Sequence, residues 1–190
     1  ADIDREPGFG PHDLMPDVVA CLGGLLPESG HTPDHVFGVG LSLPGTVDPR
    51  RGCSVDSPVL SGWDGVPLVP YLRALTDAPV VVDNDANVIA LAEWRSGAGR
   101  GADDVLVTKA STGLGAGIIS GGALQRGATR SAGEFGHNKT AAAAGKACRC
   151  GDVGCLEAVA GGWALVRSLA ENGQKARNLR DVIGLAHSGD

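Results

Sequence analysis

The stretch "APVVVDNDANVIALAEWRSGAG" (residues 78–99) joins an apolar run directly to a helical pattern, and it decides the fold class. Its uninterrupted run of valines is typical of a strand buried on both faces. The segment "ANVIALAEW" that follows predicts a helix, which Gly97 and Gly99 would end. Two more apolar strands are predicted at "DVLVTKA" (104–110) and "AGIISGG" (116–122). This alternation of strands and helices predicts an α/β fold.

The remaining elements extend the same alternation on both sides. The pattern predicts a helix with Pro16 in its first turn that ends near Pro27, and then a strand in "HVFGVGLSL" (35–43). Short or longer helices are predicted from about Pro67, from Leu156 to about Asn172, and across "NLRDVIGLA" (178–186). The pattern changes between residues 97 and 104. We therefore predict two partial lobes, 1–100 and 101–190.

Composition and charge exclude several classes of function. The formal net charge of the 190-residue chain is −6, and no run of Lys or Arg is present, which argues against a nucleic-acid surface in this segment. No apolar run reaches the roughly 20 residues of a membrane span. The five cysteines are an odd number, and three of them are clustered, which indicates metal ligands in a reducing cytoplasm more than disulfides. We expect a cytoplasmic protein without membrane contact.

The clustered cysteines have a histidine upstream of them. Ten residues separate His137 from Cys148, one residue separates Cys148 from Cys150, and four separate Cys150 from Cys155. Three thiolates and one imidazole predict a closed, tetrahedral, structural Zn²⁺ site. The alternative is a chance cluster of thiols in a flexible loop.

Two glutamates flank the predicted metal site. Glu134 precedes His137, and Glu157 follows Cys155. A metal fixes the orientation of a histidine ring, so two carboxylates near it could bind the hydroxyls of a polar ligand. Equally, both glutamates could be solvated or could cap the loop and the helix.

A second polar group follows the apolar run of valines. Asp83, Asn84 and Asp85 come at the carboxyl end of the predicted strand, where open α/β sheets bind ligands. A carboxylate there can accept the proton of a hydroxyl nucleophile. It can also cap the helix that follows, and one of the three is expected to do so, which leaves Asp83 or Asp85 for chemistry.

The glycine-rich "STGLGAG" (111–117) nearly matches a dinucleotide-binding fingerprint, and Glu134 lies about twenty residues further on. That fingerprint requires a helix next, whereas "AGIISGG" predicts a strand. The segment is instead predicted to be a turn of a hairpin, with backbone amides that face a phosphate.

Taken together, these segments resemble the ROK family of repressors, open reading frames and sugar kinases. The resemblance rests on "GVGLSLPGTVD" (38–48), "SPVLSGWDGVPL" (57–68), "VVVDNDANVIALAEWRSGAGRG" (80–101), "STGLGAGIISGGALQRGA" (111–128), "AGEFGH" (132–137) and "CRCGDVGCLEAVA" (148–160). It implies an actin-like, ribonuclease-H-like ATPase fold with two lobes, here as an incomplete fragment with a zinc loop. The family also implies a homo-oligomer.

The resemblance assigns roles residue by residue. Asp85 would be the general base that deprotonates a sugar hydroxyl. The sugar-binding set would comprise Pro44, Gly45, Asn84, Asp85, Glu134, His137 and Glu157. The turn with Thr112, Gly113 and Gly115 would face nucleotide phosphates.

The chain also departs from the family's pattern. The opening Asp-x-Gly-Gly-Thr phosphate loop is missing, and so is the later segment that covers adenosine, so we expect the middle portion of a longer protein. This fragment alone is not expected to phosphorylate a sugar. Lys109 and "STGLGAG" look more like the repressor branch. The prediction is therefore the sugar-sensing portion of a transcriptional regulator, whose DNA contacts would come from an upstream domain. The alternative is part of an ATP- and Mg²⁺-dependent hexose or N-acetylhexosamine kinase, and a scaffold that keeps zinc for stability alone is a third reading.

Overall fold

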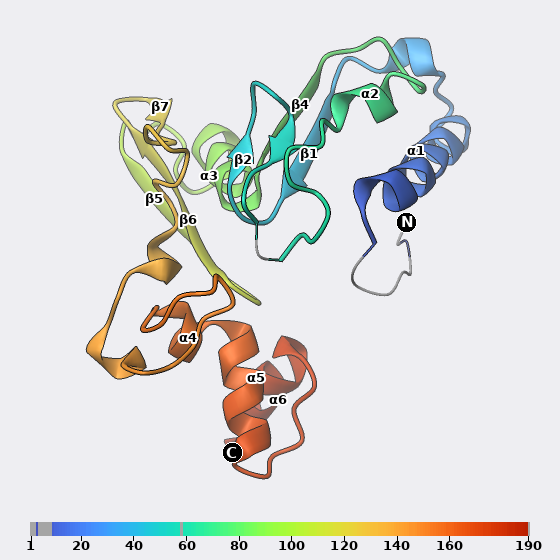
Figure 1. Ribbon diagram of the computed structural model, residues 1–190. Coiled ribbons are helices and arrows are strands. Elements are labelled where there is room, and N and C mark those ends of the chain that lie inside the picture. The colour runs from blue at the N-terminus through green and yellow to red at the C-terminus, as the bar shows by residue number, and fades with distance from the viewer. Residues whose placement is uncertain (1–2, 4–8, 58, 190) are drawn as a thin grey trace. The chain divides into compact units, whose positions relative to one another are not determined.

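The computed structural model describes residues 3, 9–57 and 59–189, and it has a mixed α/β architecture (Figure 1). The chain divides into two compact units, Ala1–Asp85 and Ala86–Asp190, each of which is described by itself. The sequence placed the boundary between two lobes after residue 100, and that lobe boundary stays a prediction.

The first unit contains a parallel pair of strands. Strand β1 (Val39–Leu43) lies beside β4 (Val80–Asn84), with Val39 opposite Val80 and Leu43 opposite Asn84. Between them in sequence, β2 (Val47–Asp48) and β3 (Cys53–Ser54) form a short antiparallel hairpin. Because β1 and β4 run in the same direction, the residues that follow each strand emerge at the same edge.

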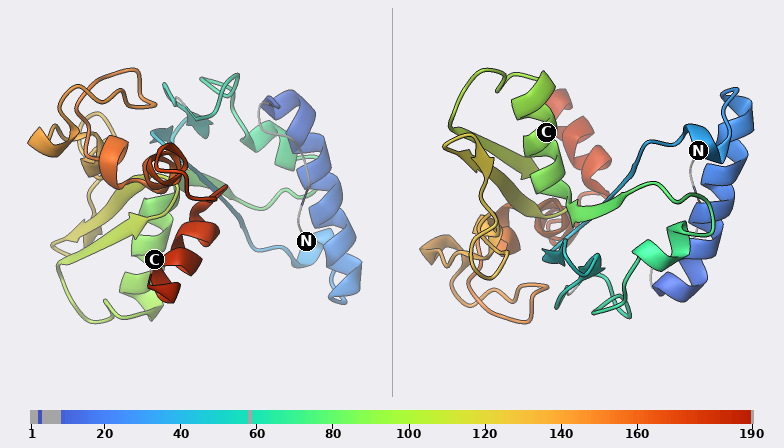
Figure 2. Two further views of the ribbon diagram at one scale, coloured as in Figure 1. Left: turned by 90° about the horizontal axis from the view of Figure 1, so that it is seen from below. Right: turned by 90° about the horizontal axis from the view of Figure 1, so that it is seen from above.

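Three helices complete the first unit: α1 (Pro11–Glu28), the 3₁₀ turn η1 (Pro33–His35) and α2 (Val69–Leu72). Met15 of α1 is buried in one cluster with Leu43, Leu72 and Val82. In both views of Figure 2, α1 lies beside α2. The prediction that Pro16 occupies the first turn of this helix was wrong, because the helix begins at Pro11. The fixed φ of a proline suits the first helical position.

The second unit is built on an antiparallel hairpin. Strand β5 (Val105–Ala110) pairs with β6 (Leu114–Ser120), and β7 (Ala123–Leu124) pairs with the end of β6. This hairpin confirms the predicted strand, glycine turn and strand. Helix α3 (Asp85–Ser96) lies along the hairpin in Figure 2. A Cβ atom at Gly117 of β6 would come within 2.5 Å of the carbonyl oxygen of Ala86, so the close approach of helix and strand requires glycine.

The rest of the second unit follows the hairpin in sequence. It comprises η2 (Phe135–His137), η3 (Ala141–Ala143), α4 (Glu157–Ala160), α5 (Gly162–Glu171) and α6 (Leu179–Ser188). One helix was predicted from Leu156 to Asn172, but the chain is extended at Gly161, with φ −70° and ψ 149°. The break has a physical reason. The N–H groups of Gly162 and Trp163 donate to the carbonyl oxygens of Ser111 and Thr112, at 2.9 and 3.1 Å.

The predicted burial of the strands on both faces was wrong. Val82 is buried, but its neighbour Val81 is 57% exposed, and Leu106 of β5 is 65% exposed. Within the described residues, β4 belongs to a sheet of two strands and β5 to a sheet of three, and no residue of β5 is buried. Among the helices of the described residues, none combines the length and apolar character of a membrane span.

The contact between α3 and β6 predicts the effect of a single methyl group. Gly117→Ala should lower the free energy of unfolding by about 1–3 kcal/mol, because the new Cβ overlaps the backbone of α3. Gly184→Ala is the matched control, since a Cβ at that position in α6 meets nothing within 4 Å. It should raise the free energy of unfolding by about 0.5–1 kcal/mol. Urea unfolding of both variants tests the pair, and equal effects would contradict the proposed overlap.

Candidate functional site

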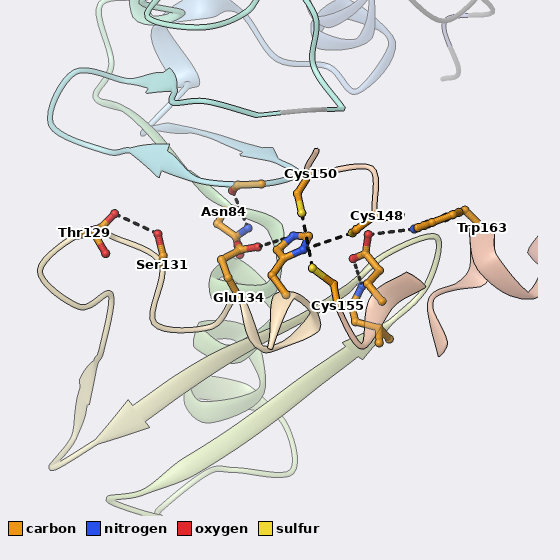
Figure 3. A network of polar contacts seen from close by, with 12 residues as sticks. Asn84, Thr129, Ser131, Glu134, Cys148, Cys150, Cys155 and Trp163 are labelled. Carbon is orange, nitrogen blue, oxygen red and sulfur yellow. Dashed lines mark hydrogen bonds and ion pairs between the residues drawn. The ribbon is translucent and has the colours of Figure 1, made fainter. Parts of the chain in front are cut away.

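The four predicted metal ligands come together in the second unit. His137 lies in η2, Cys148 and Cys150 lie in the following loop, and Cys155 directly precedes α4. Their ligand atoms all lie within 4.8 Å of one another. Figure 3 shows the three cysteine side chains pointing toward a common centre.

The spacing of these atoms fits a tetrahedral ion better than a disulfide. The sulfur of Cys148 lies 3.7 Å from Nδ1 of His137, and the sulfur of Cys150 lies 3.7 Å from that of Cys155. Zinc–sulfur bonds of about 2.3 Å and zinc–nitrogen bonds of about 2.0 Å put tetrahedral ligands roughly 3.4–3.8 Å apart. All of these cysteines are free thiols. The set could therefore hold a metal ion.

Burial disfavours the charged form of the Cys148 thiol. Burial raises the pKa of Cys148 to about 12, far above the ordinary value of 9.0. At neutral pH this thiol stays protonated unless a positive charge compensates the thiolate. A metal ion held by Cys148 and its three neighbours would supply that charge.

Lys139 supports the loop from outside the cluster, and sequence reasoning missed it. Its Nζ donates to the sulfur of Cys155 at 3.3 Å and to the carbonyl oxygen of Val153 at 2.8 Å. It also pairs with the carboxylate of Asp152 at 2.5 Å, and this bond is the main cause of a raised pKa for Lys139 and a lowered pKa for Asp152. No motif in the sequence indicates this contact.

The imidazole of His137 faces two different groups. Its Nδ1 lies toward Cys148, and its Nε2 lies 3.7 Å from Oε2 of Glu134. That distance exceeds a hydrogen bond, although the two groups remain close. Both side chains keep part of their surface exposed, at 31% for His137 and 24% for Glu134. A polar ligand can therefore reach the pair, with the metal ligands behind the ring.

Glu157 lies in a different environment from Glu134. It is the first residue of α4 and is only 8% exposed, so the possibility that it is solvated is excluded. Its Oε1 accepts the indole N–H of Trp163 at 3.0 Å, and its Oε2 accepts the backbone N–H of Leu114 at 2.8 Å. A Cβ at Gly113 would come within 2.7 Å of Oε2, so the carboxylate reaches the turn only because residue 113 is glycine.

The predicted phosphate-facing turn is residues 111–113, between β5 and β6, and Gly115 lies within β6. Its carbonyl oxygens at Ser111 and Thr112 accept the first N–H groups of the α5 region. In the part of the chain that the structure describes, no hydrogen bond uses the N–H groups of Thr112 and Gly113. These two amides can therefore donate to a ligand.

In the first unit, the other predicted residues gather at one strand edge. Pro44 and Gly45 follow β1, and Asn84 ends β4 beside them, with its Nδ2 donating to the carbonyl oxygen of Gly45 at 2.9 Å. Asp83 is buried, and its Oδ1 accepts the N–H of Asn84 at 2.8 Å. Asp85 begins α3. The parallel pairing of β1 with β4 brings this group together, and the functional roles assigned to it stay predictions.

Comparison with known proteins identifies the class of protein. The chain is 39% identical over 145 residues to a glucokinase of Halalkalibacterium halodurans, covering 75% of this chain and 44% of that enzyme. It is 33% identical over 178 residues to the xylose repressor of Bacillus subtilis, covering 94% of this chain and 44% of the repressor. The structure is similar to that of a ROK family glucokinase from Streptomyces griseus in complex with glucose and AMPPNP. The TM-score is 0.74 at 36% identity, over 90% of this chain and 52% of that one.

The family model of the ROK family matches residues 11–190. The chain belongs to the ROK family, as its motifs predicted, and its mixed α/β fold is that of the ROK kinases. It spans about half the length of the curated relatives it matches.

The two hydrogen bonds of the buried Glu157 carboxylate predict how its neutralisation changes the stability of the protein. Glu157→Gln should lower the free energy of unfolding by about 1–3 kcal/mol, because the amide NH₂ would face one of the two N–H donors. Glu171→Gln is the control, since Glu171 is 68% exposed and lies 3.7 Å from Arg167. Its effect should stay within about 0.5 kcal/mol. Chemical denaturation of both variants measures the difference, and an unchanged stability of Glu157→Gln would contradict the two-donor assignment.

Proposed function

We propose that this chain is the sugar-binding portion of a ROK protein, with a structural zinc ion that orients part of the sugar site. One observation carries the proposal: the ring of His137 has one nitrogen toward the cysteine cluster and the other toward Glu134. A ring held by a metal through Nδ1 presents Nε2 in a fixed direction, next to a carboxylate. That pair suits the donors and acceptors of neighbouring sugar hydroxyls.

Zinc is the metal that the ligand set favours. Three thiolates and one imidazole suit a borderline-soft ion, and four protein ligands fill a tetrahedral shell. With no open position, the metal would organise the loop and would not activate water. The family's zinc loop is proposed here as His137, Cys148, Cys150 and Cys155.

The proposed sugar site combines groups of complementary chemistry. In the second unit, Glu134 and Glu157 would accept hydrogen bonds from hydroxyls, and His137 would complete that set. In the first unit, Asn84, Pro44 and Gly45 keep the sugar-binding role that the resemblance implies. The complex of the S. griseus glucokinase with glucose supports a sugar as the ligand class. We further propose that the two partial lobes, 1–100 and 101–190, belong to an actin-like ATPase fold.

For the whole protein, we propose a transcriptional regulator that senses a sugar. Lys109 and "STGLGAG" support this, as does the xylose repressor, which matches 94% of the chain. DNA contacts would then come from another domain, and the protein would act as a homo-oligomer in the cytoplasm.

The second candidate is an ATP-dependent sugar kinase. It is supported by the glucokinase relative and by Asp85, a carboxylate at the start of α3 that could serve as general base. The N–H groups of Thr112 and Gly113, with Gly115 nearby, would then face the nucleotide phosphates of a Mg²⁺–ATP complex. A kinase catalyses phosphoryl transfer by positioning the reacting groups and by neutralising the charge of the phosphates.

The zinc proposal predicts a coupled loss in one variant. Cys150→Ser should lower the zinc content below one ion per chain and weaken sugar binding by about 10–100-fold, because the metal supports His137. Cys21→Ser is the control, since Cys21 lies in α1, away from the ligand set in sequence. Metal analysis and titration calorimetry with glucose and xylose measure the two effects. A drop in zinc content at unchanged sugar affinity would show that the metal does not support the sugar site.

The two whole-protein candidates differ in their dependence on Asp85. In a kinase, Asp85→Asn should lower kcat by about 10²–10⁴-fold and largely spare sugar affinity, because a general base acts in the transition state. Asp77→Asn, at an exposed position, is the control. ATP consumption by the full-length protein across hexoses and N-acetylhexosamines is the measurement. Sugar-dependent turnover would contradict a pure sensor, whereas a sugar-specific rise in Tm without turnover would contradict a kinase.

A further inference from the structure

We propose that Trp163 is a positioning residue that links the metal loop to the carboxylate of Glu157. The inference rests on the proposed function, in which Glu157 binds sugar and the loop holds zinc. It adds a residue to that site and gives a physical route by which the metal affects the sugar.

The first link is between the metal loop and the indole ring. Arg149 lies between the metal ligands Cys148 and Cys150, and its guanidinium carbon is 4.9 Å from the ring centroid of Trp163. Such cation–π contacts depend on the guanidinium remaining over the ring. A metal ion that fixes both neighbouring cysteines also fixes the backbone from which Arg149 extends.

The second link is between the ring and the carboxylate. The indole N–H donates to Oε1 of Glu157 at 3.0 Å, a bond that Figure 3 marks with a dashed line at Trp163. Oε2 is held by the N–H of Leu114, so two donors on different elements set the plane of the carboxylate. Without the indole N–H, Oε1 would lose the contact that sets its direction.

The ring has a second cation that does not depend on the loop. The guanidinium carbon of Arg167 lies 5.0 Å from the ring centroid, and Arg167 also donates to the carbonyl oxygen of Ala158 at 3.2 Å. Arg167 is in α5, the same helix as Trp163. Loss of the metal should therefore free Arg149 and leave Arg167 in place, which changes the surroundings of the ring without removing all of its support.

Trp94 provides a matched control within the chain. Its ring also has a guanidinium over it, that of Arg95 at 4.6 Å, and its N–H also donates a hydrogen bond, here to the carbonyl oxygen of Ala102 at 2.9 Å. Trp94→Phe and Arg95→Ala therefore remove the same kinds of contact. Neither touches Glu157 or the metal loop through these contacts.

The experiment compares Trp163→Phe and Arg149→Ala with these two controls in the full-length protein. The readouts are zinc content, affinity for glucose and xylose by calorimetry, and the emission of Trp163, taken as the spectrum of each protein minus that of its Trp163→Phe counterpart. Trp163→Phe should keep its zinc and weaken sugar affinity by about tenfold or more, because a hydrogen bond to a charged group is lost. Removal of zinc with a chelator should shift the Trp163 emission, and Arg149→Ala should abolish that shift. Both controls should behave as the parent protein does.

Three results would overturn the inference: unchanged sugar affinity in Trp163→Phe, no emission shift when zinc is removed, or an undiminished shift in Arg149→Ala. If Trp163→Phe fails to fold, Arg149→Ala decides through the total tryptophan emission, with Arg149→Lys expected to restore the shift because it retains a cation. If the parent protein binds neither sugar, the proposed ligands are wrong, and the emission arm still tests the link between loop and ring. The failure of the inference and the failure of the proposed function are therefore distinguishable.

Discussion

The arrangement of the second unit depends on one buried carboxylate. A carboxylate in a site as closed as that of Glu157 is tolerated only where donors satisfy its oxygens, and here each oxygen has one. The donors come from the start of β6 and from α5, while Glu157 itself begins α4, two residues after the last cysteine. The hairpin turn, the two helices and the loop are thereby fixed to one another. Glycine at residue 113 is the local consequence of this contact.

The loop between η2 and α4 buries few apolar side chains that could stabilise its conformation. Its buried cluster consists of Cys148, Cys155 and Ala158, with Cys150 and Trp163 packed against it. Small side chains of this kind bury too little apolar surface to order about twenty residues, since each ordered residue costs about 1–2 kcal/mol of backbone entropy. The side chain of Lys139 stabilises the loop through polar contacts with Val153, Cys155 and Asp152. A metal ion at the four ligands would supply the larger part of the missing stabilisation.

The sequence was informative where local pattern decides structure and uninformative where tertiary neighbours do. Apolar runs located β4, β5 and β6, and the spacing of His and Cys located the possible metal site. A Gly-Gly pair does not show whether a helix continues through it or breaks at it. The extended backbone at Gly161 therefore could not be predicted from a sequence with a helical pattern on both sides. The exposure of Val81 depends on which elements cover its sheet. Trp163 and Lys139 were missed because they lie outside the quoted motifs, and only the tertiary structure pairs them with Glu157 and Asp152.

The proposed residues separate sugar binding from phosphoryl transfer. His137 and Glu157 are positioned by contacts that involve no nucleotide, namely the cysteine cluster, the indole of Trp163 and the N–H of Leu114, and Glu134 lies beside His137. A regulator and a kinase can therefore use the same carboxylates and imidazole, because either needs only that these groups match a set of hydroxyls. Transfer requires in addition a base such as Asp85 and amides free to face phosphate, as those of Thr112 and Gly113 are among the described residues. This separation allows one family to contain both sugar kinases and sugar-responsive repressors. Under the proposed function, the metal loop would serve sugar binding in either case.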